Sequence, residues 1–163
     1  RFVLVGTMNP EEGDIRPQLL DRFGLSVEVK GEKDTELRKE VVRRRVLFDE
    51  NPEFYFNSCQ KELSDLKKKI KKAQQARYDV VSDDSLLDAI VSVTSHFGID
   101  GHRADITMLK AAKANAALEG RKKATKEDIA ATASLVLSHR VRRRPFEETS
   151  FDTAELEKCL QEI

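Results

Sequence analysis

Two arginines and one asparagine are the side chains of this sequence best suited to phosphate chemistry. Arg22 and Arg103 carry planar, permanently charged guanidinium groups, whose fork of N–H donors matches the oxygens of a phosphate. Asn9 follows a short apolar run, and its side-chain amide is able to orient a water molecule or a γ-phosphate. These residue types point to a phosphorylated ligand.

Each of the three residues also has a structural interpretation. Asn9 is equally suited to an Asx-turn. Arg22 has neighbouring carboxylates, such as Asp21 and Glu28, with which it could form an ion pair. Arg103 stands at the expected start of a helix, where the helix dipole disfavours a cation. This electrostatic mismatch slightly favours a functional role for Arg103.

Other candidate groups are weaker. The adjacent pair Glu11–Glu12 could serve in acid–base chemistry or bind a metal, but neighbouring carboxylates beside a turn are usually solvated. His96, His102 and His139 lie on different expected elements and lack an HxxxH or HExxH spacing, so we do not expect a zinc site. The basic run Arg140–Arg144 is interpreted as a solvated helix end rather than a nucleic-acid-binding patch.

The composition argues against several classes of protein. The 163 residues include 29 basic and 29 acidic side chains, so the chain has no net attraction to nucleic acid or to a membrane surface. No stretch approaches the roughly 20 apolar residues that cross a bilayer. Cys59 and Cys159 lack a metal-binding spacing, and two lone cysteines in a highly charged chain indicate reduced thiols in a cytoplasmic compartment.

The elements that would position Asn9 and Arg22 form an α/β unit. Phe2–Val5 is apolar and rich in β-branched residues, which is typical of a buried strand. A polar turn and a short helix follow, Gly24 is placed as the helix stop, and Leu25–Val29 has the pattern of a second strand. Because two strands do not make a stable open sheet, we expect this sequence, which begins without methionine, to be a fragment.

The rest of the sequence is predicted to be mainly helical. Apolar residues recur at helical spacing, and good start signals, at Asp34, at Ser82–Asp84 and at Thr125, stand at the beginning of the expected helices. The expected helices cover about residues 34–49, 53–77, 82–97, 102–119, 125–144 and 152–163. We therefore divide the chain into part of an α/β domain at 1–31, linking helices with a long arm at 32–81, and a helical bundle at 82–163.

Several blocks of the chain have a distinctive sequence. Two lie near its start, Gly6–Gly13 (GTMNPEEG) and Arg16–Gly24 (RPQLLDRFG). Others are Asp100–Arg103 (DGHR), Ala111–Ala114 (AAKA) and Ser138–Pro145 (SHRVRRRP). Together these blocks resemble the ATPase subunit of magnesium chelatase, the small AAA+ motor of chlorophyll synthesis, and the resemblance covers nearly the whole chain. The combination of NPEEG with RPQLLDRFG is not a general ATPase signature.

The resemblance implies a role for each candidate residue. Asn9 matches sensor 1, which positions the attacking water near the γ-phosphate. Arg22 matches the arginine finger, which reaches into the nucleotide site of the neighbouring subunit. Arg103 matches sensor 2 in a helical lid. The long arm matches an insertion before sensor 2 that relocates the lid in this clade.

The resemblance also implies cofactors and partners. Such subunits use ATP and Mg²⁺, form rings that we expect to be hexameric, and act with a larger subunit carrying an integrin-like domain and a catalytic porphyrin-binding subunit. The implied work is ATP hydrolysis that powers insertion of Mg²⁺ into protoporphyrin IX. This sequence contains no GxxxxGK[ST] loop and no Walker B segment, so alone it should neither bind ATP tightly nor hydrolyse it.

Three alternatives remain open on the sequence. The segment Gly6–Asn9 departs from the GSGN of photosynthetic members, so the metal is either magnesium or cobalt, as in a cobaltochelatase. Another AAA+ clade, such as a MoxR-type chaperone or a relative of replicative helicases, would share the same elements. A non-enzymatic helical module, which binds a partner or nucleic acid through its basic helix end, belongs to a different class.

Overall fold

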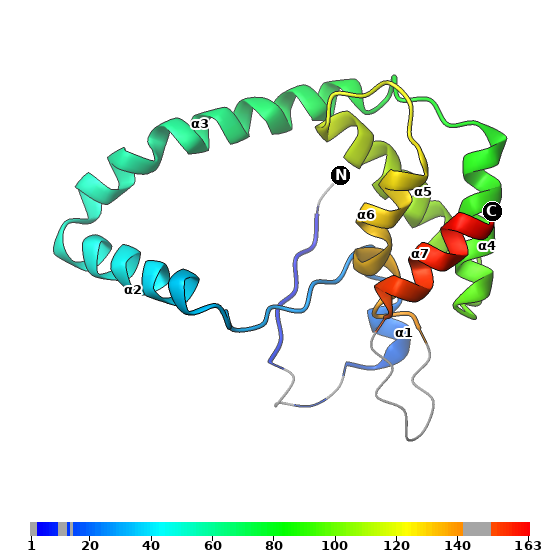
Figure 1. The fold of residues 1–163 in the computed structure, drawn as a ribbon, viewed down its shortest axis with the longest axis horizontal. Helices are drawn as coiled ribbons and strands as arrows, with labels where there is room; N and C mark the ends of the chain where they lie inside the picture. The colour runs from blue at the N-terminus through cyan, green and yellow to red at the C-terminus, as the bar shows by residue number, and fades with distance from the viewer. Residues whose placement is uncertain (1–2, 10–12, 14, 142–150) are drawn as a thin grey trace.

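A computed structural model describes residues 3–9, 13, 15–141 and 151–163 of the chain. Figure 1 shows a bundle of helices from which a long helical arm extends. The helices are α1 (Pro17–Leu20), α2 (Thr35–Glu50), α3 (Pro52–Ala76), α4 (Asp84–His96), α5 (Arg103–Leu118), α6 (Lys126–Leu137) and α7 (Thr153–Glu162). The predominantly helical fold expected from the sequence is confirmed.

Side-chain caps explain where these helices begin. The Asp34 carboxylate accepts two hydrogen bonds of 2.9 Å from backbone N–H groups in the first turn of α2. The Asn51 side chain accepts one of 3.0 Å in the first turn of α3, which starts with a proline. Ahead of α6, the Asp128 carboxylate accepts from the Thr125 N–H at 2.9 Å. Each contact satisfies an N–H group that has no partner within its helix.

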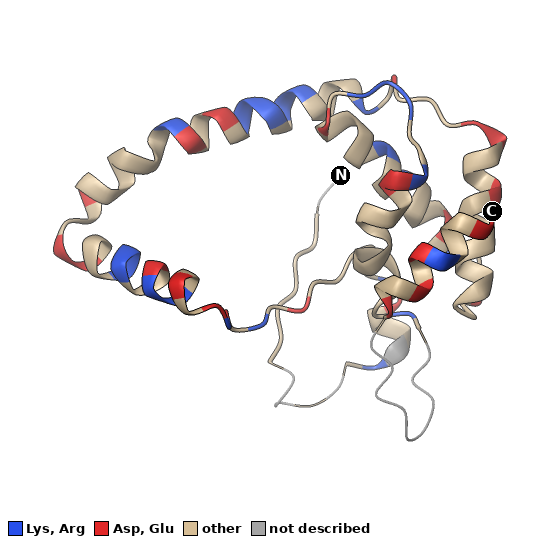
Figure 2. Ribbon diagram, viewed as in Figure 1, with Lys and Arg blue, Asp and Glu red and all other residues tan. Residues whose placement is uncertain are grey.

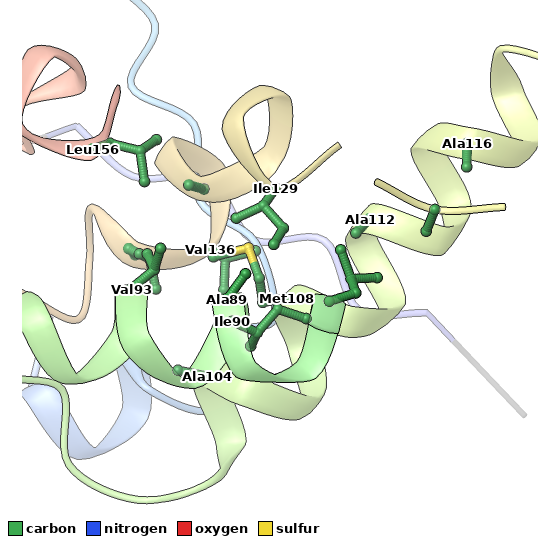
Figure 3. Packing of buried hydrophobic residues seen from close by; sticks show 14 of the residues in the cluster. Ala89, Ile90, Val93, Ala104, Met108, Ala112, Ala116, Ile129, Val136 and Leu156 are labelled. Carbon is green, nitrogen blue, oxygen red and sulfur yellow. The ribbon is translucent and has the colours of Figure 1, made fainter. Parts of the chain in front are cut away.

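Helices α4 to α7 enclose one apolar core, part of which is drawn in Figure 3. α5 contributes a row of fully buried alanines, and their small side chains allow the close approach of α6, its main neighbour. Larger side chains fill the remaining space, among them Leu86, Ile90, Val93, Met108, Ile129, Val136, Leu137 and Leu156. Burial of this apolar surface is the main source of stability for the bundle.

The arm consists of α2 and α3, and it is far less buried than the bundle. Figure 1 shows that α2 and α3 are joined by a turn far from the bundle, and that α3 returns from this turn to the bundle. The two helices contact each other. No residue of α2 is buried, and in α3 only Ala73 is. The apolar face predicted for α2 exists as a stripe, but its residues Val41 and Val42 remain 61% exposed. Tertiary packing, which supplies most of the stability of a helix in water, therefore stabilises the helices of the bundle more than those of the arm.

The two strands expected near the start of the chain are not formed. Phe2 lies outside the described residues, and neither 3–5 nor 25–29 has strand structure. The apolar side chains of both segments face solvent, with Val3 and Val29 each 90% exposed. A strand needs a neighbouring strand to satisfy its backbone groups, and these segments pair with none of the described residues. The β-pairing that the described residues do contain is one isolated parallel bridge between Val81 and Lys123.

Charged side chains lie mainly on the outer faces of the helices. Figure 2 shows the basic residues of α3 clustered in its second half, near the loop that joins α5 to α6. Lys69 crosses to that loop and lies 3.1 Å from the Glu119 carboxylate. Among the described residues, no helix combines the length and the apolar character needed to cross a membrane.

Gly24 does not end α1 in the manner expected. The helix is a single turn that stops at Leu20, and Gly24 is not among the glycines with positive φ. Gly120 does have this role for α5, because its φ of 74° allows the left-handed turn that follows the helix. The difference arises because the segment after α1 is held by contacts with the bundle rather than by a helix cap.

Candidate functional site

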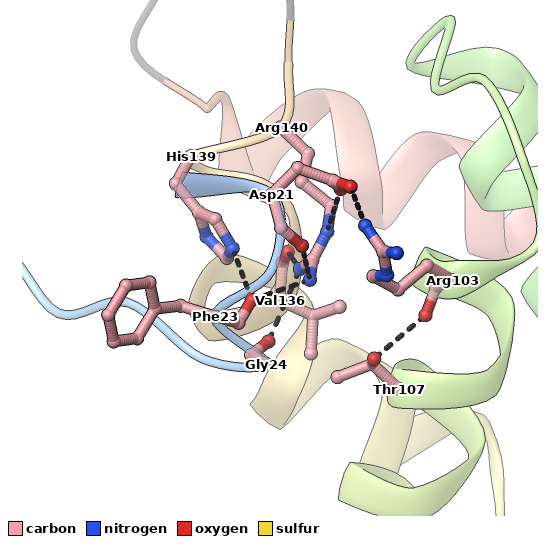
Figure 4. A network of polar contacts seen from close by, with 8 residues as sticks. All are labelled: Asp21, Phe23, Gly24, Arg103, Thr107, Val136, His139 and Arg140. Atoms are coloured by element: carbon pink, nitrogen blue, oxygen red, sulfur yellow. Dashed lines mark hydrogen bonds and ion pairs between the residues drawn. The ribbon is translucent and has the colours of Figure 1, made fainter. Parts of the chain in front are cut away.

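The carboxylate of Asp21 joins the N-terminal part of the chain to the bundle. Its Oδ2 accepts a hydrogen bond from Arg103 at the start of α5, and its Oδ1 lies 3.3 Å from Nε of Arg140, just beyond α6. Figure 4 shows the two guanidinium groups meeting at this carboxylate. Asp21 and Arg103 are each about half exposed, with 45% and 55% of the side chain accessible, so this pair can exchange partners with solvent or a ligand.

Arg140 is the buried member of the network, with 2% of its side chain exposed. Its guanidinium donates hydrogen bonds to the carbonyl oxygens of Asp21 at 3.3 Å, Phe23 at 2.7 Å and Gly24 at 3.2 Å, and to that of Val136 in α6. Burial lowers the pKa of Arg140 below its ordinary value, although Asp21 opposes this shift. Because arginine stays protonated, a buried positive charge is held by four carbonyls and one carboxylate.

His139 adds a second contact to the same backbone. Its Nε2 lies 3.1 Å from the carbonyl oxygen of Phe23, and because a carbonyl only accepts, Nε2 must carry the proton. Nδ1 is buried and has no hydrogen-bond partner among the described residues. Burial lowers the pKa of His139 below its ordinary value of 6.5, and the charge of Arg140 acts in the same direction. His139 is therefore neutral at pH 7.

We expect acid to weaken this contact. Because the pKa of His139 is lower in the folded than in the unfolded chain, its contribution to stability is complete above about pH 6.5 and is lost as the pH falls below that value. His139→Gln keeps an N–H donor near Nε2 and removes the titrating group. Thermal unfolding between about pH 8 and pH 5 should show a larger fall in midpoint for the wild type than for His139→Gln. Parallel curves for the two proteins would contradict this assignment.

The backbone holds the segment 21–26 against the bundle independently of these side chains. The N–H groups of the two residues after Asp21 donate back into α1 at 3.0 Å, which closes a tight turn. Farther on, the Ser26 N–H donates to the Leu135 carbonyl of α6 at 2.8 Å. The turn and this single bond define where the segment lies, and the Arg140 and His139 side chains bind the carbonyls between them.

Arg22 is exposed, although both neighbours in this turn are held by the bundle. The ion pairs proposed for it are not present: Asp21 pairs with Arg103 and Arg140, and Glu28 lies 3.1 Å from Lys30. Within the part of the chain that the structure describes, Arg22 forms no ion pair. Its side chain therefore projects from a fixed turn toward the outside of the molecule.

Asn9 lies in the exposed N-terminal segment 3–9 rather than in the Asp21 network. This segment approaches the turn at Gly6, where a Cβ atom would lie 3.4 Å from Cζ of the Phe23 ring. In Figure 1 the segment 3–9 lies between the arm and the bundle. Of the three residues predicted from the sequence, the structure thus brings Arg103 to Asp21, leaves Arg22 exposed next to Asp21 in the chain, and places Asn9 in the separate segment 3–9. Glu11 and Glu12 lie outside the described residues.

Sequence reasoning missed three members of this site: Asp21, His139 and Arg140. The interpretation of Arg140 as part of a solvated helix end was wrong, because Arg140 is almost completely buried. Residues 142–144 of the same run lie outside the described residues. Asp21 and Arg140 are 119 positions apart, and no helical or strand periodicity relates residues at that separation. The feature of the sequence that could have indicated this contact is the presence of the distinctive blocks RPQLLDRFG and SHRVRRRP, which contain its residues, in one chain.

A second polar network lies inside the bundle. The fully buried carboxylate of Asp128 accepts hydrogen bonds from both terminal nitrogens of Arg121, at 2.7 and 2.5 Å. It also accepts from Asn115 at 2.8 Å and from the Thr125 N–H at 2.9 Å. Burial raises the pKa of Asp128, but these donors outweigh burial and hold the pKa below its ordinary value of 3.8. The network ties the end of α5 to the start of α6, so its role is structural.

Similarity to known proteins extends over the whole chain. Residues 87–159 match the family described as the AAA lid domain. The chain is 45% identical over 163 residues to a magnesium-chelatase subunit ChlI homolog of Methanocaldococcus jannaschii and 46% identical over 147 residues to the magnesium-chelatase 38 kDa subunit of Chlorobaculum tepidum. These matches include 100% and 90% of this chain but 45% and 38% of the two relatives. The chain thus spans less than half the length of these curated relatives.

The fold is also similar to a crystal structure of a candidate ATPase from Cytophaga hutchinsonii. The TM-score is 0.62 and the sequence identity 22%, and the match covers 93% of this chain and 49% of that one. At this identity the likeness concerns the fold alone. The sequence relationships confirm the resemblance to the magnesium-chelatase ATPase subunit that the motifs indicate.

Proposed function

We propose, from its relationship to the ChlI-type magnesium-chelatase subunits, that this chain is the sensor and lid part of an AAA+ ATPase motor. In the full-length protein, ATP hydrolysis would power the insertion of Mg²⁺, the metal substrate, into protoporphyrin IX. The observation that carries this proposal is 45% identity to a ChlI homolog across all 163 residues. Similarity restricted to the lid would have supported an AAA+ protein of any clade.

The family match and the burial of the residues support the proposed division of the chain. Residues 82–163 contain the bundle that matches the AAA lid, and 32–81 contain the arm. Residues 1–31 would belong to an α/β ATPase core. The exposed apolar side chains of Val3, Val5 and Val29 support this, because such residues are normally buried in a sheet.

The two arginines have environments that suit their proposed roles. Arg103, as sensor 2, is held by Asp21 at the surface of the bundle, and the γ-phosphate of ATP would replace that carboxylate as its partner. Arg22, as the arginine finger, projects outward and would reach the nucleotide of the neighbouring subunit. Asn9, as sensor 1, would be positioned by the strand that residues 3–5 form within a complete sheet.

The cofactors of this motor need residues beyond those described. Arg22 and Arg103 fit the negative charge of a nucleotide phosphate. The described residues hold no group of three His, Cys, Asp or Glu side chains able to bind a metal ion. ATP and its Mg²⁺ would therefore depend on Walker A and Walker B segments, which this sequence does not contain. The proposed partners are further copies in a ring, expected to be hexameric, a larger integrin-domain subunit and a porphyrin-binding subunit, all in the cytoplasm.

The direct test is an assay of the full-length protein combined with its two partner subunits. ATP-dependent insertion of Mg²⁺ into protoporphyrin IX, followed by the fluorescence of the product, is the expected result. Insertion of Co²⁺ into its tetrapyrrole instead would identify a cobaltochelatase. ATP hydrolysis without insertion of either metal would favour the chaperone clade, and absence of ATPase activity would contradict the motor itself.

The role of Arg103 has its own test. Arg103→Ala in the full-length protein removes a charge-assisted hydrogen bond to phosphate, which is worth about 1.5–3 kcal/mol. We expect the affinity for ATP to fall by about 10- to 100-fold, measured by titration with a fluorescent ATP analogue. Arg38, an exposed residue of α2, supplies a control, because Arg38→Ala removes the same charge on the arm, which Figure 1 shows apart from α1. Equal affinities in the two variants would contradict the sensor role.

A further inference from the structure

We infer that Arg140 is a positioning residue for Arg22: it holds the turn from which the proposed arginine finger acts on the neighbouring subunit. This inference rests on the proposed function, because it concerns the geometry of a group that works in trans. It assigns a task in the reaction to an arginine of the bundle whose side chain is buried. The argument depends on which atoms Arg140 binds, how deeply it is buried and what else holds the turn.

The hydrogen bonds of Arg140 surround Arg22 without including it. Three of the four carbonyl oxygens that accept from it belong to the residue before Arg22, Asp21, and to the two residues after it, Phe23 and Gly24. Figure 4 shows these acceptors converging on one guanidinium group. A planar fork that binds three carbonyls of one turn restricts the direction in which the intervening Cα–Cβ bond points. The direction of the Arg22 side chain is thus set from the lid.

The burial of Arg140 indicates that this arrangement is more than a surface contact. A charged group removed from water is costly unless its donors are satisfied, and here the backbone carbonyls of Asp21, Phe23, Gly24 and Val136 supply most of the acceptors. Moving the turn away from the lid would leave this charge with Val136 alone among these acceptors. The turn is therefore strongly favoured in one position, and His139 reinforces it through the Phe23 carbonyl.

The same carboxylate connects this turn to the proposed sensor. Asp21 accepts from Arg140 through Oδ1 and from Arg103 through Oδ2. If a phosphate takes Arg103 from Asp21, Arg140 still holds the turn by its other bonds. Arg140 thus keeps the finger in place while Arg103 changes partner, and this is the task that we assign to it.

The first test is the kinetics of Arg140→Lys in the full-length protein. Lysine keeps the charge but provides a single ammonium group in place of the fork, so the turn loses most of its bonds. Displacement of a catalytic group by about 1 Å can cost roughly 10²-fold in rate. We expect kcat for ATP to fall by about 10²-fold, with KM changed by less than about twofold. Arg121→Lys is the matched control, because Arg121 belongs to the structural network at Asp128, and its kcat should be unchanged.

The second test uses mixed rings, since a fault in the finger is corrected by a neighbour. Rings of Arg140→Lys with a variant that lacks the Walker A lysine should recover activity, because the Walker-defective subunit supplies an intact Arg22. Rings of Arg140→Lys with Arg22→Ala should not recover, because both subunits lack a working finger. If Arg140 served its own nucleotide site or the lid fold alone, the first mixture would also stay inactive.

The outcomes separate this inference from the proposed function. Arg22→Ala mixed with the Walker-defective variant must recover activity if the finger acts in trans, and failure there would refute the proposed function. If Arg22→Ala recovers activity with the Walker-defective variant but Arg140→Lys does not, the positioning role of Arg140 is refuted and the proposed function is not. A raised KM with unchanged kcat would also refute it. Circular dichroism establishes whether the variants fold. If Arg140→Lys does not fold, the same experiments are carried out with Arg140→Gln, which avoids a buried charge.

Discussion

Replacing Arg22 by alanine in the full-length protein is expected to lower the turnover of ATP by about 10³-fold or more, because a trans arginine finger stabilises the charge that develops on the transferred phosphoryl group. Nucleotide binding should stay largely intact, since Arg22 would contact the neighbour's nucleotide and not its own. Phosphate release measures the turnover, and titration with a fluorescent ATP analogue measures the binding.

The geometry of the turn is the reason to expect so large an effect. Asp21 and Phe23, on either side of Arg22, are bound to the lid, whereas Arg22 itself is exposed and forms no ion pair with any described residue. Because the backbone of this turn is already held, only the Arg22 side chain has to be ordered when it meets a phosphate, and its contribution is available for the transition state.

The control for Arg22 is another arginine of similar exposure. Arg38→Ala changes the net charge by the same amount but lies on the arm. It should leave turnover within about twofold of the wild type, since exposed charges away from a site contribute little. Full activity in Arg22→Ala would remove the finger assignment. A loss of nucleotide binding equal to the loss of turnover would move Arg22 to its own nucleotide site instead.

The helices were predictable because their signals are local. The caps at Asp34, Asp83 and Thr125 and the periodic apolar residues between them act within a few positions of the chain. The strands at 3–5 and 25–29 were predicted from equally local signals but are not formed. A strand depends on a partner for its backbone hydrogen bonds, and the described residues provide none at either segment.

The candidate site was predictable in part. The roles of Arg22 and Arg103 are indicated by residue type and by the family resemblance, whereas the sequence indicates Asp21 only as a possible ion-pair partner of Arg22. The contact between Asp21 and Arg140 joins residues that are 119 positions apart. Such a non-local contact depends on the tertiary packing of the whole chain and not on the local preferences of either segment. Arg140 in particular has the sequence context of a solvated helix end, and only its burial reveals its role.

The bundle itself should depend on the charge pair between Arg121 and the buried carboxylate of Asp128. Arg121→Ala leaves that carboxylate without its cation, although Arg121 itself is 39% exposed and the pair is therefore partly solvated. An unsatisfied buried acceptor typically costs about 1–3 kcal/mol, and we expect about 1–2 kcal/mol because Asn115 and the Thr125 N–H still donate to Asp128. For a chain of this length the midpoint of thermal unfolding should fall by about 2–8 °C.

A neighbouring ion pair supplies the control for this stability effect. Lys123 lies 2.7 Å from Asp83, but both side chains are about half exposed, so Lys123→Ala should lower the unfolding midpoint by less than Arg121→Ala does. If the two variants unfold at the same temperature, burial of the Asp128 pair is not what stabilises the bundle. That result would leave apolar packing alone to join α5 and α6.

The pH dependence distinguishes a lost charge pair from a general loss of packing. In the wild type the lowered pKa of Asp128 gives stability that is complete above about pH 3.8 and is lost as the pH falls through the folded-state value. Without Arg121, burial should raise the pKa of this carboxyl above 3.8. The variant is then destabilised at neutral pH, where the buried carboxylate is charged, and this destabilisation decreases as the carboxyl takes up a proton. The stability deficit of Arg121→Ala should therefore shrink from pH 7 toward about pH 4. A deficit that is constant over this range would assign the effect to lost packing of the arginine stem, because packing does not titrate.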